Sequence, residues 1–246
     1  SRLAISATAL NAVADIANLL LNKLFGETRQ LKGLPSKTSK VTTFSTSSYA
    51  PSSLNAIICR TNATAFEYFF KFHSYLNGEK KIRLEVDGKR SKDIFSGIFQ
   101  LRANKRPTCK ELQNFSSYQE LVDHIQVFGE VEGATTELKT FLDLTNQYSW
   151  QVIEWALENS MADDETDPKN TLVISTSHKS KGLEWDNVLI AKGFNYKILD
   201  KKLMISADEK RLLYVTVTRA KNILFTDGIN DLLEHLNSKN MEISNA

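Results

Sequence analysis

Hydrophobic and polar positions divide the first third of the chain into a helix, a polar loop and a strand followed by a helix. Apolar residues recur at the 3, 4 and 7 spacing of an amphipathic helix through residues 6–25. Residues 36–53 hold eleven serines and threonines in eighteen positions, which predicts a loop with an edge strand near residues 41–44. The apolar run 54–59 predicts a buried strand, and residues 63–75 predict a helix whose aromatic side chains pack in the core.

The rest of the chain changes from helical patterns to alternating strands and helices. Residues 91–159 are mostly helical in pattern, so we expect an inserted helical subdomain there, followed by an acidic linker at residues 159–170. Strands are then expected at residues 172–176, 187–191 and 222–226, and helices at residues 207–220 and 229–236, with an irregular link between residues 191 and 207. This alternation predicts an α/β fold, a parallel sheet flanked by helices.

The composition is that of a globular protein, with 41% hydrophobic and 24% charged residues among 246. No run approaches the ~20 apolar residues that a membrane-spanning helix needs, and no basic-then-apolar leader is recognised at the N-terminus. We therefore expect a soluble, intracellular protein, cytoplasmic or, in a bacterium, associated with the nucleoid. Two cysteines and four scattered histidines match neither a disulfide framework nor the ligand spacing of a metal site, so no bound metal is expected.

Positive charge is unevenly distributed along a chain whose formal net charge is only +2. Residues 178–221 contain ten lysines and arginines against five acids, whereas the remainder contains 21 basic and 24 acidic residues. The basic excess therefore lies in one segment, which is where an anionic partner would bind.

The chain has no phosphate-binding loop of the G-x-x-x-x-G-K-[ST] type. Gly88 and Lys89 come nearest, but Arg83 stands at the first glycine position and Arg90 at the Ser or Thr position. The acidic cluster at residues 163–165 does not follow an apolar strand, so we assign it to the linker. The chain is therefore expected to have no magnesium-phosphate site of its own.

Two segments within or next to the basic region have far more specific patterns. Residues 176–186 read TSHKSKGLEWD directly after a predicted strand, and residues 208–221 read DEKRLLYVTVTRAK over a predicted helix. They resemble motifs V and VI of superfamily 1 helicases of the UvrD/Rep/PcrA type, whose patterns are T-x-H-x-x-K-G-L-E-[FW] and E-E-x-R-L-x-Y-V-x-x-T-R-A-K. Only Asp208 departs from these patterns, and it keeps the negative charge.

The resemblance covers most of the chain. Residues 60–63, RTNA, resemble a signature of the same domain, and the helix at residues 6–21 resembles the one after motif IV. The insertion is most similar to that of the F-box DNA helicase branch and its bacterial relatives. The resemblance implies a RecA-like fold in which residues 1–90 and 169–246 form the second RecA-like domain, and residues 91–168 form the inserted helical accessory subdomain with its linker.

The resemblance also implies residues that contact the nucleotide. Arg219 would be an arginine finger, which reaches the γ-phosphate of ATP held by a neighbouring domain; the alternative is a surface arginine. Glu184 would accept a hydrogen bond from a ribose hydroxyl, or else be an exposed loop acid. Gly182 would let the backbone approach a ligand. Arg211 is expected to pair with a carboxylate and orient its helix.

A second group of residues would bind single-stranded DNA. The resemblance makes Thr176 and His178 donors to a DNA phosphate, to which Lys179 and Lys181 would add positive charge. A structural histidine is the alternative at His178. Arg60 has two possible roles: it packs at the junction of strand and loop, or it contacts the single-stranded DNA.

One departure from the family pattern lies near the N-terminus. Motif IV resembles S-F-R-x-x-x-x-I-A, and its arginine also reaches the ATP phosphates. Alignment on Val13 and Ala14 places Ala7 and Thr8 at the Phe and Arg positions, and threonine cannot supply that charge. Three explanations stay open: Arg2 substitutes from another register, this end is divergent, or the ATP site is weakened.

The resemblance as a whole implies the second motor domain of an ATP-dependent 3′ to 5′ DNA helicase or translocase. ATP would bind between this domain and a missing N-terminal RecA-like domain of the same protein, which would bring the phosphate loop and Mg²⁺. This fragment alone is then expected to be an inactive ATP hydrolase. The insertion is a candidate surface for a protein partner. The rival hypothesis is a non-catalytic module that keeps the motor fold and binds DNA or protein. If the chain is part of a motor, its pathway could be DNA repair, recombination control or plasmid or phage biology.

Overall fold

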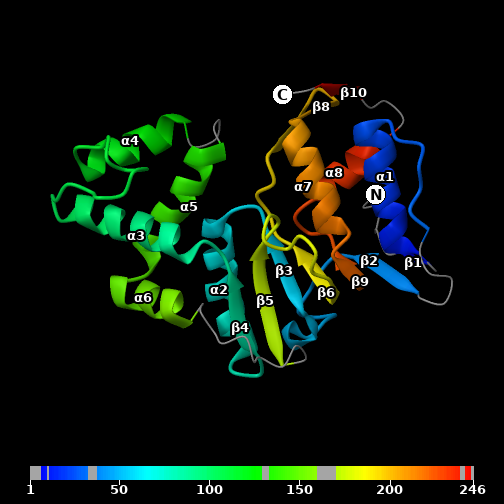
Figure 1. The fold of residues 1–246 in the computed structure, drawn as a ribbon, viewed down its shortest axis with the longest axis horizontal. Helices are drawn as coiled ribbons and strands as arrows, with labels where there is room; N and C mark the ends of the chain where they lie inside the picture. The colour runs from blue at the N-terminus through cyan, green and yellow to red at the C-terminus, as the bar shows by residue number, and fades with distance from the viewer. Residues whose placement is uncertain are drawn as a thin grey trace.

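A sheet of seven strands forms the centre of the computed structural model, which describes residues 7–9, 11–32, 38–128, 133–159, 170–238 and 242–244. The strands are β1 (Ala7–Ala9), β2 (Ser39–Thr42), β3 (Ala56–Cys59), β4 (Lys81–Glu85), β5 (Thr171–Thr176), β6 (Trp185–Ile190) and β9 (Ala220–Phe225). Their order is β1-β2-β9-β6-β3-β5-β4 (Figure 1). Six described strands, from β2 to β4 in this order, are parallel, and β1 pairs antiparallel with β2 at one edge.

Helices cover both faces of the sheet and bury two separate cores. Helix α2 (Asn62–Leu76) packs on one face, and helices α1 (Ala12–Phe25), α7 (Ala207–Val217) and α8 (Asn230–Leu236) pack on the other (Figure 1). Because side chains alternate along a strand, Ile57 of β3 joins the core under α2, whereas its neighbour Ile58 joins the core under α7. This layered arrangement confirms the expected α/β fold, and it is consistent with a RecA-like domain.

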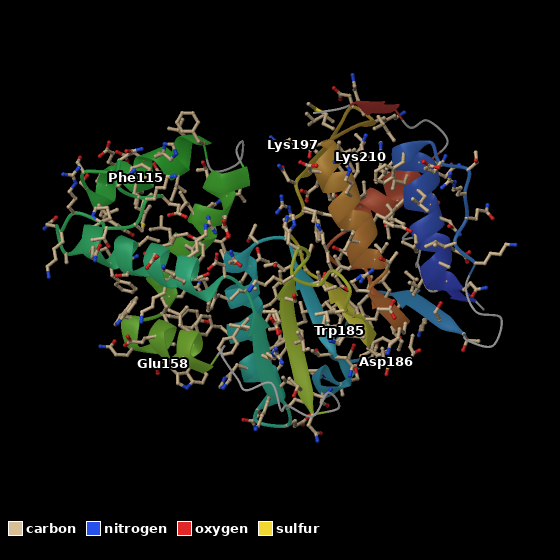
Figure 2. All side chains as sticks on the ribbon, in the orientation of Figure 1. Phe115, Glu158, Trp185, Asp186, Lys197 and Lys210 are labelled. Atoms are coloured by element: carbon tan, nitrogen blue, oxygen red, sulfur yellow. The ribbon has the colours of Figure 1, made fainter. Side chains whose placement is uncertain are left out.

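Four more helices form a lobe beside α2. They are α3 (Gly88–Arg102), α4 (Tyr118–Phe128), α5 (Gly133–Gln147) and α6 (Trp150–Asn159), and Figure 2 shows Phe115 and Glu158 in this lobe, on the left. Phe95 of α3 packs edge-on against Phe66 of α2, with ring centroids 5.3 Å apart, and against Phe141 of α5 at 4.7 Å. The apolar core of the lobe is therefore continuous with the core under α2.

The structure corrects the sequence expectations at the N-terminal end. The helix expected from residue 6 begins at Ala12, because Ala7–Ala9 pair with β2 as an antiparallel strand. The strand expected near residues 41–44 lies at residues 39–42 and is not an edge strand, since β1 and β9 flank it. Arg2, the acidic cluster at residues 163–165 and most of the expected linker lie outside the described residues.

Two further corrections concern strands that the hydrophobic pattern did not indicate. β4 alternates polar and apolar residues at the edge of the sheet, so it lacks the continuous apolar run of a buried strand. The link expected to be irregular forms the hairpin β7 (Tyr196–Leu199) and β8 (Lys202–Ile205), and β10 (Glu242–Ser244) pairs with β8. Asp200 and Lys201 turn this hairpin with positive φ angles of 48° and 67°, a geometry usually taken by Asn-Gly.

No helix among the described residues is both long and apolar enough to cross a lipid bilayer.

Gly228 allows the turn after β9 to cross the end of β6. Its amide donates to the carbonyl oxygen of Ile190 at 3.0 Å, and a Cβ atom here would lie 2.0 Å from the carbonyl oxygen of Ala191. Because that neighbour is backbone and cannot rotate away, we expect Gly228→Ala to lower the free energy of unfolding by about 3 kcal/mol. Urea denaturation followed by circular dichroism measures the loss.

Gly97→Ala is the control for this substitution. A Cβ atom at Gly97 would meet side-chain atoms of Cys109 and Leu112, each at 2.9 Å, and these can shift. Its loss should therefore be smaller, about 1 kcal/mol. Equal losses in the two variants would contradict the assigned role of Gly228.

Candidate functional site

The segments with the helicase-like patterns begin near the carboxyl ends of the central parallel strands. The chain leaves β3 toward β4 on one side and later reaches β6 on the other side, so the direction of winding reverses at β3. In open α/β sheets, ligands bind at the carboxyl ends of the strands near such a reversal. Arg60 directly follows β3, and residues 177–184, which we call the motif V loop, directly follow β5.

Arg60 is bound to helix α7 by an ion pair. Its Nε lies 2.8 Å from Glu209 Oε2 and 3.1 Å from Oε1, and Glu209 Oε1 also accepts from the backbone N–H of Asn195 at 2.8 Å. Glu209 lies in the first turn of α7 with 2% of its side chain exposed, where the helix dipole also favours a carboxylate. The Arg60 side chain stays 29% exposed, so this packing role leaves part of it on the surface.

The motif V loop turns its serines inward and its cations outward. Ser177 and Ser180 are buried: the N–H of Ser177 donates to the carbonyl oxygen of Cys59 at 2.9 Å, and the N–H of Ser180 donates to that of Thr176 at 2.9 Å. His178, Lys179 and Lys181 are exposed. Nζ of Lys179 donates to the carbonyl oxygen of Val86 at 2.9 Å. The hydrogen bonds of the two serines hold the backbone of the loop in place. The loop therefore exposes cationic side chains at the carboxyl ends of the strands.

His178 and Thr176 differ in their access to solvent. Thr176 is the last residue of β5 and is only 7% exposed, so it offers little surface to a ligand. His178 is exposed, but partial burial of its ring and the positive charges of Arg60 and Lys181 lower its pKa below the usual 6.5. A neutral imidazole near pH 7 still has one N–H to donate to a phosphate oxygen.

Gly182 and Glu184 lie on the exposed part of the same loop. Gly182 has φ +82°, a conformation that favours glycine, and a Cβ atom there would meet no other atom within 4 Å. The space in front of its backbone is therefore open to a ligand. Glu184 is exposed directly before Trp185, the first residue of β6.

Arg219 lies after the end of α7, in the turn before β9, rather than in the helix as the sequence suggested. All of its polar atoms have partners: Nε donates to Val215 O at 2.8 Å, Nη1 to Leu183 O at 2.9 Å and Nη2 to Thr218 Oγ1 at 2.9 Å. Its guanidinium thus binds a carbonyl group at the C-terminus of α7 and ties the helix to the motif V loop. These bonds use three of its five N–H groups, so one N–H on each of Nη1 and Nη2 stays available to a γ-phosphate.

Arg219 and Arg60 lie at opposite ends of the parallel strands. The carbonyl oxygen of Arg219 accepts from the N–H of Trp185 at 2.9 Å, at the amino end of β6, whereas Arg60 follows the carboxyl end of β3. In Figure 2, Lys210 lies near the upper end of α7, and Trp185 lies well below it, beside the sheet. Helix α7 therefore runs from the carboxyl ends of the strands to their amino ends.

Arg211 faces a cavity that the sequence did not indicate. Its Nη1 lies 2.8 Å from Asp208 Oδ1, so the expected carboxylate pairing is present, but the two side chains are 68% and 88% exposed and the pair adds little stability. The α1–α7 cavity, of about 920 Å³, falls within the size range of small-molecule sites. It is lined by Leu21, Phe25, Glu27, Arg29, Gln30, Leu31, Arg60, His178, Lys181, Asp208, Arg211, Leu212, Tyr214 and Val215.

Sequence reasoning missed Arg29 altogether and did not assign Arg211 to the ligand. Arg211 had a signal, an arginine within motif VI, but only the structure shows that it is exposed at a cavity. Arg29 had none, because it lies outside every recognised motif. Within the described parts of the chain, no three His, Cys, Asp or Glu side chains lie close enough together to bind a metal ion.

Comparison with known proteins agrees with the residues that form this site. The family of UvrD-like helicase C-terminal domains matches residues 37–229, a span that contains Arg60, the motif V loop and α7. F-box DNA helicase protein 1 of Schizosaccharomyces pombe is 28% identical over 242 residues, which cover 92% of this chain and 26% of that protein. The chain thus spans about a quarter of the length of this relative. The family match covers most of the chain, and the chain belongs to the UvrD-like helicase C-terminal domain family.

Proposed function

We propose that this chain is the second RecA-like domain of an ATP-dependent DNA helicase or translocase that moves 3′ to 5′ along single-stranded DNA. The family implies a DNA helicase motor domain. The proposal of a DNA translocase is supported by the cluster of exposed cations around the α1–α7 cavity and the motif V loop. This cluster lies at the carboxyl ends of the strands, where α/β folds bind ligands. A DNA substrate also favours an intracellular location.

The residues of this chain fit one half of an ATP site. Glu184 is exposed next to the amino end of β6, where it could accept a hydrogen bond from a ribose hydroxyl, and Arg219 lies beside it, since its carbonyl oxygen accepts from the N–H of Trp185. The sequence contains no phosphate-binding loop, so a first RecA-like domain of the same protein would hold the triphosphate and Mg²⁺. On its own the chain is then expected not to hydrolyse ATP. Closing of the two domains on ATP would move the DNA that both hold.

Two arginines are candidates for the contact with the γ-phosphate. Arg219 is the candidate from motif VI, and its guanidinium uses three of its five N–H groups within the chain. Arg211 makes only an exposed ion pair with Asp208, which can be exchanged at small cost. Arg219 lies beside Glu184 at the amino end of β6, whereas Arg211 lines a cavity near Arg60 at the other end of the strands. This placement favours Arg219 at the phosphate, where its charge would stabilise the transition state.

A second hypothesis, a non-catalytic module that docks DNA or protein, is favoured by Thr8 at the arginine position of motif IV. The residues encoded before Ser1 distinguish the two. A strand, a G-x-x-x-x-G-K-[ST] loop and a helix upstream support the motor, and their absence from the whole gene supports docking.

Substitution of the two arginines in the full-length protein separates their roles. We expect Arg219→Ala to lower kcat for ATP hydrolysis about 10³-fold and also to lower the unfolding midpoint, because it removes three hydrogen bonds within the chain. Arg211→Ala should leave kcat and the midpoint nearly unchanged, because its ion pair with Asp208 is exposed. Steady-state kinetics and thermal unfolding measure both. The reverse pattern, with kcat lost only in a stable Arg211→Ala variant, would make Arg211 the finger.

Binding of single-stranded DNA should weaken steeply with salt. Each phosphate neutralised contributes about 0.7 to the slope of log affinity against log salt, so Lys179→Ala and Lys181→Ala should each reduce the slope by about that amount. Fluorescence anisotropy of a labelled oligonucleotide measures it. Lys202→Ala, on the exposed hairpin strand β8, is the control and should leave the slope unchanged. A slope near zero in the unsubstituted protein would remove the DNA role of the loop.

The DNA contact of His178 predicts a pH dependence. Burial and neighbouring cations lower the pKa of His178 in the free protein, and a bound phosphate would raise it, so binding should take up a proton. Affinity for single-stranded DNA should therefore increase as pH falls from about 7.5 to about 5.5. His178→Gln keeps a donor but cannot become charged, so it should lose this increase. An increase of the same size in that variant would contradict the contact.

A further inference from the structure

The motif V loop is attached to helix α7 near both of its ends. Toward its end, the carbonyl oxygen of Leu183 accepts from Arg219 Nη1 at 2.9 Å. At its start, Ser177 Oγ lies 2.9 Å from Oγ1 of Thr216, a residue in the last turn of α7. Ser177 directly precedes His178 in the chain, and Thr216 lies three positions before Arg219. The hydroxyl contact therefore connects the loop proposed to bind DNA with the end of α7 that carries the arginine proposed for the γ-phosphate.

Ser177 and Thr216 form this contact inside the protein, where both side chains are fully buried. Ser177 Oγ donates its proton to the carbonyl oxygen of Cys59 at 3.3 Å, so it accepts from Thr216. The hydroxyl of Thr216 has one proton and two acceptors within reach. These are Ser177 Oγ at 2.9 Å and, one turn earlier in its own helix, the carbonyl oxygen of Leu212 at 2.8 Å.

The second acceptor makes the contact between α7 and the loop reversible. Opening a buried hydrogen bond is costly when it leaves the donor unpaired. Here the proton of Thr216 can turn to Leu212, while Ser177 keeps its bond to Cys59, so no buried donor loses its partner. A contact that forms and breaks during a reaction cycle needs this property.

The helicase motifs assign no role to this pair of hydroxyls. Positions 177 and 216 are both unspecified in the patterns of motifs V and VI, so the resemblance is satisfied by any residue type there. A role for the pair follows only from its position in space.

We infer that Thr216 is a positioning residue that couples ATP binding to DNA binding. This inference rests on the proposed function, since it requires ATP at the Arg219 end of α7 and DNA at the motif V loop. While the hydroxyl of Thr216 is bonded to Ser177, a movement of α7 at the nucleotide carries the start of the loop, and with it His178, along. ATP then changes the affinity for single-stranded DNA, and loss of the hydroxyl removes part of that change.

The test measures how strongly the full-length protein binds a fluorescent single-stranded oligonucleotide with and without a non-hydrolysable ATP analogue. The ratio of the two affinities is the coupling factor, and linkage requires the same factor when analogue binding is measured with and without DNA. Thr216→Val keeps the shape of the side chain and removes the hydroxyl. We expect it to reduce the coupling factor about fivefold, toward 1. Thr216→Ser keeps the hydroxyl and should retain the factor within about twofold.

Thr226→Val is the matched control. Thr226 is also fully buried, but its hydroxyl bonds to Asn230 Oδ1 at 2.6 Å and to the carbonyl oxygen of Thr42 at 3.4 Å, and not to the motif V loop. Because each valine variant loses a buried hydroxyl contact, the unfolding midpoint should fall by similar amounts in both, whereas only Thr216→Val should lower the coupling factor. Equal coupling factors in the two variants would overturn the inference and leave the proposed function intact.

Ser177→Ala removes the same contact from the side of the loop. If the contact carries the coupling, the double variant Thr216→Val with Ser177→Ala should have the same coupling factor as either single variant. Additive losses would overturn the inference, because the two hydroxyls would then act independently. A coupling factor of about 1 in the unsubstituted protein would also overturn it. Failure of that protein to bind the oligonucleotide or the analogue would overturn the proposed function as well.

Discussion

The position of β3 between two parallel neighbours is the constraint on which the rest of the structure depends. All four of its residues are fully buried, and they alternate between the core under α2 and the core under α7. Parallel strands cannot be joined by tight turns, so each must be followed by a crossover that returns the chain to the same side. The segments that follow β3 and β5 therefore both begin at the carboxyl ends of the strands, and this places Arg60 near the motif V loop.

Helix α7 depends on this sheet at both of its ends. Glu209 in its first turn binds Arg60 at the carboxyl end of β3. Arg219, just after its last turn, binds Leu183 through its side chain and Trp185 through its backbone, near the amino end of β6. Between them, Thr216 Oγ1 lies 2.9 Å from the buried Ser177 Oγ. A displacement of α7 would therefore move the motif V loop with it. In a motor domain, such a connection would link events at a nucleotide to residues at DNA.

Much of this fold could be predicted from the sequence, because its central strands and helices have strong local patterns. The continuous apolar run before Arg60 indicated β3, since burial on both faces of the sheet leaves no polar positions in that strand. The aromatic stripe indicated α2, because one face of that helix is buried. Strands β4, β7 and β8 escaped prediction for the opposite reason. They lie at sheet edges or in a small hairpin, alternate polar with apolar residues, and are stabilised by pairing with partners distant in sequence or across an unusual turn.

The sequence by itself determined the family, because motifs V and VI are contiguous strings that can be recognised without knowing what surrounds them. Only the tertiary structure decided which cations are already engaged. Arg60 is paired with a carboxylate 149 residues away, and Arg219 binds a carbonyl 36 residues away, whereas Arg211 is exposed at a cavity. The availability of a charge depends on its neighbours in space, and folding brings those neighbours from distant parts of the chain.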